Sequence, residues 1–185
     1  MQILLIRHAK VKINSTKKLN FYQMQEWLKR YELCDISYKK PSREVIEIIK
    51  SSKFIACSSS LRAKSSLELI DIKINFIDDI FKELKITLLP LPFIKLKPSM
   101  WLFISRVYTL VPFSMANRVF KKEKKRVKKA AEILNSLSKE HKSITLLGHG
   151  VFNYLLVTEL KKFNFKVKKS KNAHQNWGYK LLKSL

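Results

Sequence analysis

Two histidines and two arginines of this chain stand in settings that suit catalysis. Arg7 and His8 follow directly on a short apolar run, and Arg62 follows a run of three serines. His149 lies between two of the three glycines in the chain. Because the chain contains only seven arginines and four histidines, their concentration in these motifs marks a candidate site.

These residue types favour phosphoryl transfer. A neutral imidazole is a good nucleophile at neutral pH and can form a covalent intermediate. An arginine presents a planar fork of donors that matches the oxygens of a phosphate. We therefore expect His8 to attack phosphorus, while Arg7, Arg62 and His149 stabilise the charge on the phosphoryl oxygens. Such chemistry needs no metal, so the pattern predicts a site without metal or cofactor.

The order of apolar runs and helical patterns predicts an α/β fold. Short, wholly apolar runs are typical of strands buried on both faces of a parallel sheet, and amphipathic stretches between them are typical of covering helices. We predict strands at 3–6, 53–57, 74–77, 143–147 and 179–182. We predict helices at 21–33, 41–51, 63–70, 117–140 and 151–160. The alternation indicates a mostly parallel sheet.

The predicted strands also suggest how the candidate residues meet. In open α/β sheets, ligands bind just beyond the carboxyl ends of the strands. The strands at 3–6, 53–57 and 143–147 each end at one of the candidate motifs. If these strands are parallel neighbours, both histidines and both arginines lie on one rim of the sheet.

Three motifs, taken in order, resemble the histidine phosphatase (phosphoglycerate mutase-like) superfamily. Residues 5–9 (LIRHA) are similar to its Arg-His-Gly signature. Residues 57–66 (CSSSLRAKSS) resemble its Ser-Ser-x-x-x-Arg-Ala-x-x-Thr segment, and residues 147–150 (LGHG) resemble its late His-Gly element. The resemblance extends over essentially the whole chain.

The resemblance implies a three-layer sandwich, with a mostly parallel sheet between two layers of helices. It also implies that His8 becomes the phosphohistidine, and that Arg7, Arg62 and His149 bind the phosphoryl group. A single domain over 1–185 follows, with a variable insert at about 88–120 that shapes specificity. Prolines interrupt every periodicity in that insert, so we assign it no secondary structure.

The family also uses a carboxylate after the third strand as proton donor and then as the base that activates water. Glu83 stands at the corresponding place and is our choice for this role. Asp78 and Asp79 are close enough in sequence to remain alternatives.

Departures from the family pattern narrow the expected activity. Ala9 replaces the usual Gly, Cys57 replaces a Ser, and the Glu-Thr and Asn-x-x-x-Arg-x-Gln-Gly features after the nucleophile are missing. Their absence makes a phosphomutase a weaker interpretation than a phosphomonoester hydrolase. The expected substrate is a phosphorylated small molecule or a phosphoprotein.

The charge balance leaves one further alternative. The formal net charge is +24, and 31 of the 38 basic residues are lysine. We interpret this as a lysine-biased, solvated surface, which makes a nucleic-acid partner unlikely. The alternative is an inactive scaffold that binds nucleic acid or an acidic membrane through its charge. Oligomeric state is not readable from the sequence.

Membrane and compartment signals are weak. Residues 88–113 are apolar, but three basic residues and four prolines interrupt them, so we predict no transmembrane helix. A substrate-covering insert or a peripheral membrane contact is left open for this stretch. Cys34 and Cys57 are too isolated for a disulfide framework, and no secretory signal is present. We therefore expect a cytoplasmic protein.

Overall fold

A mixed six-stranded sheet forms the centre of the computed structural model, which describes residues 1–184. The strands follow the order β3-β2-β4-β1-β6-β5. Their bounds are β1 Gln2–Arg7, β2 Phe54–Ser58, β3 Phe76–Asp78, β4 Ser143–Gly148, β5 Phe165–Lys171 and β6 Tyr179–Ser184. The first four are parallel to one another, and β6 and β5 continue the sheet in antiparallel fashion.

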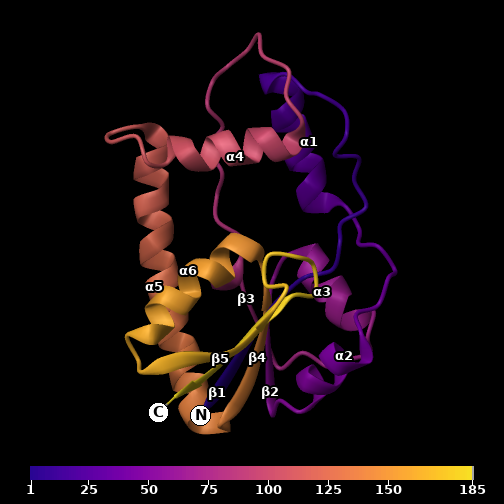
Figure 1. Ribbon diagram of the computed structural model, residues 1–185, viewed down its shortest axis with the longest axis vertical. Coiled ribbons are helices and arrows are strands. Elements are labelled where there is room, and N and C mark those ends of the chain that lie inside the picture. The colour runs from indigo at the N-terminus through magenta and orange to yellow at the C-terminus, as the bar shows by residue number, and fades with distance from the viewer. Residues whose placement is uncertain (185) are drawn as a thin grey trace.

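Helices cover both faces of this sheet (Figure 1). Helices α2 (Arg43–Lys50) and α3 (Leu61–Glu68) lie on one face, and α5 (Met115–His141) and α6 (Gly150–Lys161) lie on the other. Strand β1 contributes to a hydrophobic core on each face of the sheet. Ile3 and Leu5 pack toward α5 and α6. Leu4 and Ile6 pack toward α2 and α3. Burial on both faces is why this strand is continuously apolar. The predicted three-layer α/β sandwich is confirmed.

A smaller layer lies beyond the carboxyl edge of the parallel strands. It contains α1 (Phe21–Leu33) and α4 (Pro98–Tyr108), which lie at the upper end of the molecule in Figure 1. Trp27 and Trp101 are buried in its hydrophobic cluster. The indole Nε1 of Trp101 donates to the carbonyl of Leu19 at 2.7 Å. This layer therefore has its own packed interior above the sheet.

The predicted elements are found with small shifts at their ends. All five predicted strands are present, although β3 is only three residues long, and all five predicted helices are present. Helix α4 was not predicted, because Pro98 was interpreted as an interruption whereas it occupies the first turn, where proline is well tolerated. Strand β5 was also missed. Its lysines are exposed and only Phe165 is buried, as is typical of a protected edge strand.

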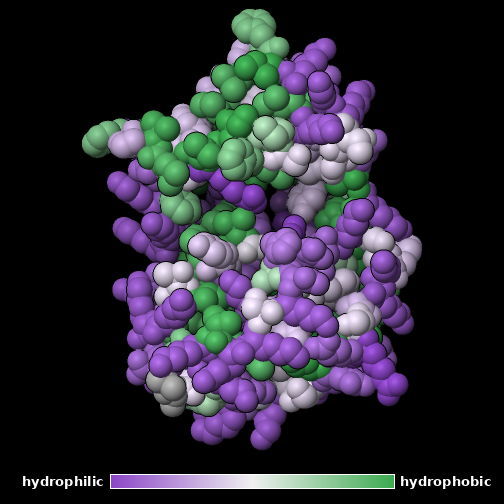
Figure 2. Space-filling view, in the orientation of Figure 1, coloured by the Kyte–Doolittle hydropathy of each residue, from purple (hydrophilic) through white to green (hydrophobic). Residues whose placement is uncertain are grey.

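The surface differs between the two ends of the molecule. Hydrophilic residues cover most of the sheet region in Figure 2, whereas hydrophobic residues gather around α4. Within residues 1–184, none of the helices combines the length and the apolar character needed to span a bilayer.

We predict that Gly178→Ala lowers the free energy of unfolding. Gly178 precedes β6, and a Cβ atom there would lie 1.7 Å from the backbone oxygen of Asn172, so the loop between β5 and β6 would have to shift. Overpacking of this kind typically destabilises by about 1–3 kcal/mol. Urea denaturation measures the change, with Ser170→Ala in the same hairpin as the control. Equal stability of Gly178→Ala and the wild type would contradict the prediction.

Candidate active site

The pairing of β1 with β4 places the two candidate histidines side by side. Arg7 pairs with Gly148 in the parallel register, and the amide of His8 donates to the carbonyl of Gly148 at 3.1 Å. The side chains of His8 and His149 follow at the two strand ends. Their ring centroids are 5.1 Å apart, with an interplanar angle of 62°. The edge-to-face arrangement brings both imidazoles to one point of the sheet rim.

The orientation of the His8 ring is fixed by the backbone around it. Nδ1 lies 2.7 Å from the carbonyl oxygen of Ala9, so it must carry the proton and donate. Nε2 therefore holds the free lone pair. Within residues 1–184, Nε2 makes no hydrogen bond. It is also not one of the fully buried atoms that lack a partner, so it keeps some contact with solvent. Asn176 also holds this turn, by donating from Nδ2 to the His8 carbonyl at 2.9 Å.

Burial keeps the His8 imidazole neutral. Only 2% of the residue is exposed. Desolvation, followed by the positive charge of Arg62, lowers the pKa of His8 from 6.5 to about 3. At neutral pH the ring is uncharged, which is the form a nucleophile requires.

His149 is held by one serine at the end of β2 and one just after it. Its Nε2 lies 2.9 Å from Oγ of Ser58 and 3.3 Å from Oγ of Ser60. Desolvation, then the neighbouring His8, lowers the pKa of His149 well below its usual value. Nδ1 is buried and has no partner. Because a serine hydroxyl can donate to Nε2, Nδ1 can carry the ring proton and donate to an anion.

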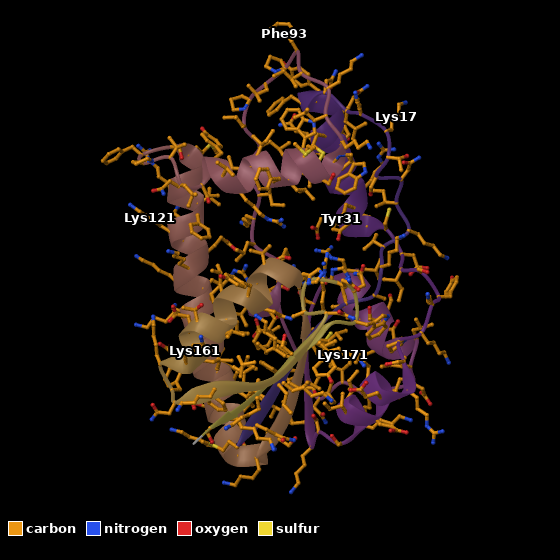
Figure 3. The ribbon with its side chains drawn as sticks, in the orientation of Figure 1. Lys17, Tyr31, Phe93, Lys121, Lys161 and Lys171 are labelled. Carbon is orange, nitrogen blue, oxygen red and sulfur yellow. The ribbon has the colours of Figure 1, made fainter. Side chains whose placement is uncertain are left out.

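Arg62 reaches the same point from the start of α3. Its side chain is 2% exposed. Its guanidinium forms a bidentate ion pair with the carboxylate of Glu32 on α1, at 2.9 Å from Nη1 and 3.3 Å from Nη2. The ring of Tyr31, at the lower end of α1 in Figure 3, lies 4.9 Å from the guanidinium carbon. Glu32 pairs with the two terminal nitrogens of the guanidinium, Nη1 and Nη2. The third nitrogen, Nε, is buried and has no hydrogen-bond partner.

Arg7 is held by the loop that joins β5 to β6. Its amide donates to Gly178, its carbonyl accepts from Trp177, and its Nη1 donates to the carbonyl of His174. The side chain lies against Gly150, where a Cβ atom would come within 3.4 Å of Nε. This Nε is also buried and unpaired.

Glu83 caps the helix that follows His149. Its carboxylate accepts from the amides of Val151 at 3.3 Å and Phe152 at 2.9 Å, in the first turn of α6. Arg126 of α5 donates to the carbonyl of Glu83 and so fixes the backbone of this turn. Glu83 and Arg7 both line a cavity of about 810 Å³, which the inner side of α4 also borders.

The two aspartates that the sequence left as alternatives are engaged elsewhere. Asp78 accepts from the amide of Ile80 at 2.7 Å and caps a short 3₁₀ turn. Asp79 is exposed and pairs with Lys82 at 2.8 Å. Neither lines the cavity, so Glu83 is the carboxylate of the three that faces it.

The structure thus brings the predicted residues close together, but only two of them line the cavity. Arg7 and Glu83 line the cavity, whereas His8, His149 and Arg62 lie behind it. Within residues 1–184, six side-chain nitrogen or oxygen atoms are buried without a hydrogen-bond partner, and three of them are the donors Arg7 Nε, Arg62 Nε and His149 Nδ1. Unpaired buried donors are rare, and together they indicate a place for an anion. No cluster of His, Cys, Asp or Glu suited to a metal ion occurs in this part of the chain.

Sequence reasoning missed two residues of this site. Glu32 lies on a polar helix and carries no sequence signal, because its partner is 30 positions away. Asn176 lies in a polar tract that matches none of the three motifs. Recognising β5 as a strand would have shown that this tract returns to the rim of the sheet beside His8.

The chain resembles known proteins in its fold but not in its sequence. No protein-family model and no curated protein sequence matches the chain. A crystal structure of phosphoserine phosphatase from Entamoeba histolytica, in complex with 3-phosphoglyceric acid, superposes with a TM-score of 0.55. It is 17% identical, and the match covers 97% of this chain and 89% of that one. A mycobacterial glucosyl-3-phosphoglycerate phosphatase gives a TM-score of 0.52 at 11% identity, over 97% and 88% of the two chains.

The chain has the fold of the histidine phosphatases. At such low identity the likeness establishes the architecture, and the motifs at the strand ends are what carry any argument about chemistry. In both comparisons the match spans 97% of this chain.

We predict that stability declines as the pH falls from about 6.5 toward about 3. The unfolded chain takes up a proton on His8 near 6.5, whereas the folded chain resists protonation until about 3, so acid favours unfolding over that window. Urea denaturation at several pH values measures the slope. It should be shallower in His8→Gln than in the wild type, and unchanged in His174→Gln, which alters an exposed histidine. Identical slopes for His8→Gln and the wild type would refute the assignment.

A second prediction concerns the Glu32–Arg62 pair. Glu32→Gln keeps the shape of the side chain but removes the charge that orients the guanidinium. Because 61% of the Glu32 side chain is exposed, the effect is modest, and we expect kcat/KM for a phosphomonoester to fall by up to about fivefold. Glu26→Gln is the matched control, since Glu26 lies on the same helix and pairs only with Lys29. If both variants behave alike, Glu32 has no positioning role.

Proposed function

We propose that the chain is a phosphomonoester hydrolase that works through a phosphohistidine on His8, without a metal ion. The observation that carries the proposal is the ring of unpaired donors around a neutral imidazole. Arg7 Nε, Arg62 Nε and His149 Nδ1 are buried without partners. A phosphoryl group would give each of them an acceptor, and burial strengthens such charge-assisted hydrogen bonds.

In the proposed first step, the lone pair on His8 Nε2 attacks phosphorus in line with the bond to the leaving group. That P–O bond breaks, its electron pair moves to the leaving oxygen, and Glu83 supplies the proton. Arg7, Arg62 and His149 hold the three equatorial oxygens, where negative charge concentrates. The products are the free alcohol and a phosphohistidine.

In the second step a water molecule replaces the alcohol. Glu83, now a carboxylate, takes a proton from water as its oxygen attacks phosphorus. The P–N bond breaks and returns the electron pair to Nε2, so that phosphate leaves and His8 is neutral again. The lowered pKa of His8 fits this cycle, because the ring then does not need to lose a proton before each attack.

The mechanism requires that a substrate reach the buried His8. The residue is 2% exposed, and it does not line the cavity that Arg7 and Glu83 share. Arg7 lines the cavity and directly precedes His8 in the chain, so the cavity lies next to the nucleophile. We infer that the substrate enters through the cavity, and that its phosphoryl group replaces the His174 carbonyl as the partner of Arg7.

The size of the cavity favours a small substrate. A volume of about 810 Å³ is in the range of small-molecule sites. The structural relatives named above are phosphatases of phosphorylated small molecules by their names. We therefore propose a phosphorylated small molecule ahead of a phosphoprotein.

Turnover of p-nitrophenyl phosphate in the presence of a chelator tests the proposal. We expect His8→Ala to be inactive, and Arg62→Ala and His149→Ala each to lower kcat/KM by about 10²–10³-fold. The matched control is His141→Ala, which alters a histidine that stacks on Phe54 away from the site. Undiminished turnover by His8→Ala would overturn the proposal, and loss of wild-type activity on chelation would overturn its metal-free form.

Two further readouts separate the remaining alternatives. Orthovanadate should raise the melting temperature of the wild type but not of Arg62→Ala, because only the complete donor ring holds the anion. Vanadate binding without turnover of any phosphomonoester would favour the inactive scaffold. An isomeric phosphate ester in place of free phosphate would indicate a phosphomutase.

A further inference from the structure

The end of the molecule farthest from the sheet carries an exposed apolar surface. Of the 17 large hydrophobic side chains that are exposed in residues 1–184, nine lie between residues 93 and 115. We call these nine the apolar cap. Its most exposed members are Phe93, Phe103, Leu110, Phe113 and Met115. Figure 2 shows this concentration around α4, and Figure 3 places Phe93 at the tip of the loop before α4.

The apolar cap is not a poorly packed part of the core. Helix α4 is anchored by its opposite side, where Trp101 is fully buried and Ser105 is 1% exposed. The same inner side borders the cavity through Ser99, Leu102 and Arg106. The outward side chains of α4 are therefore exposed on a helix that is already fixed in place. An exposed surface of this kind marks an interaction site.

Two aromatic residues protrude from this surface at loop tips. Phe93 is 96% exposed and Phe113 is 87% exposed. Phe113 also has a φ of 60°, a left-handed conformation that is unfavourable for a bulky residue. Both rings therefore project into solvent from loops at the two ends of α4.

The charge around the apolar cap is of one sign. Residues 84–122 contain seven lysines and arginines and no aspartate or glutamate. Lys121 projects from α5 beside the cap in Figure 3. A surface that combines protruding aromatic side chains with cationic neighbours matches the interface of an anionic bilayer, where rings enter the acyl boundary and lysines remain among the headgroups.

We propose that the apolar cap docks on a lipid bilayer that carries anionic headgroups. A second copy of the chain fits less well, because each copy has a formal charge of +24 and would bring the same positive surface to the contact. A nucleic acid would use the lysines but would leave aliphatic residues such as Leu110 and Met115 without a role. The proposal holds whether or not the chain hydrolyses phosphate esters.

Co-sedimentation with vesicles tests the docking. The full chain should bind vesicles of phosphatidylcholine with phosphatidylserine, and bind vesicles of phosphatidylcholine alone more weakly. The double variant Phe93→Ser/Phe113→Ser should lose about 10–100-fold in partitioning, since each ring buries apolar area in the bilayer. Tyr38→Ser is the control, because Tyr38 is also an exposed aromatic residue (68%) but lies outside the apolar cap.

A second pair of variants tests the electrostatic part. Lys121→Gln/Lys122→Gln beside the apolar cap should weaken binding by up to about fivefold per lysine at low salt. Lys166→Gln/Lys168→Gln on β5 makes the same change in net charge at the opposite end and should have a smaller effect. Circular dichroism and the melting temperature without vesicles establish that the variants remain folded.

Three results would overturn the proposal. The first is equal vesicle binding by the wild type and Phe93→Ser/Phe113→Ser. The second is a dimer that this double variant dissociates while vesicle binding is absent, which would assign the surface to self-association. The third is equal weakening of binding to a DNA oligonucleotide and to vesicles in the same variant, which would assign it to nucleic acid.

Discussion

The parallel pairing of β1 with β4 is the interaction on which the candidate site depends. The register runs from Gln2 opposite Ser143 to Arg7 opposite Gly148, and both histidines follow immediately. A slip of one residue would move one imidazole by about 3.3 Å and turn it toward the other face of the sheet. The register is protected by burial, because Ile3 and Leu5 belong to one core and Leu4 and Ile6 to the other. Packing on both faces of one strand therefore fixes the distance between two side chains at its end.

Burial has a second effect at the same point. It removes water from both imidazoles and lowers the pKa of each. It also leaves Arg7, Arg62 and His149 with donors that no group of the protein satisfies. An unmet buried donor costs about 1–3 kcal/mol, so the arrangement favours any anion that can satisfy several of them at once.

Much of this arrangement could be predicted from the sequence, because it depends on local patterns. Continuous apolar runs identified the central strands, and the polar residues at their ends identified Arg7, His8, Arg62 and His149 as one group. What could not be predicted depends on contacts between distant segments. The pairing of Glu32 with Arg62 joins helices that no pattern connects, and the choice of Glu83 over Asp78 rests on which carboxylate reaches α6. The burial of His8 behind Arg7 was also beyond sequence reasoning.

The three glycines of the chain all lie at this one rim. A Cβ atom would lie 2.7 Å from Oδ1 of Asn153 at Gly148 and 1.7 Å from the carbonyl oxygen of Asn172 at Gly178, whereas at Gly150 it would only touch the Arg7 side chain at 3.4 Å. None of them has a positive φ, whereas six other residues do, among them Lys142 and Asn164. Elsewhere the chain thus accepts strained turns made from larger residues. At Gly148 and Gly178 the missing side chain therefore matters for the space it leaves rather than for backbone freedom, so added side-chain bulk should be poorly tolerated at these two points of the rim.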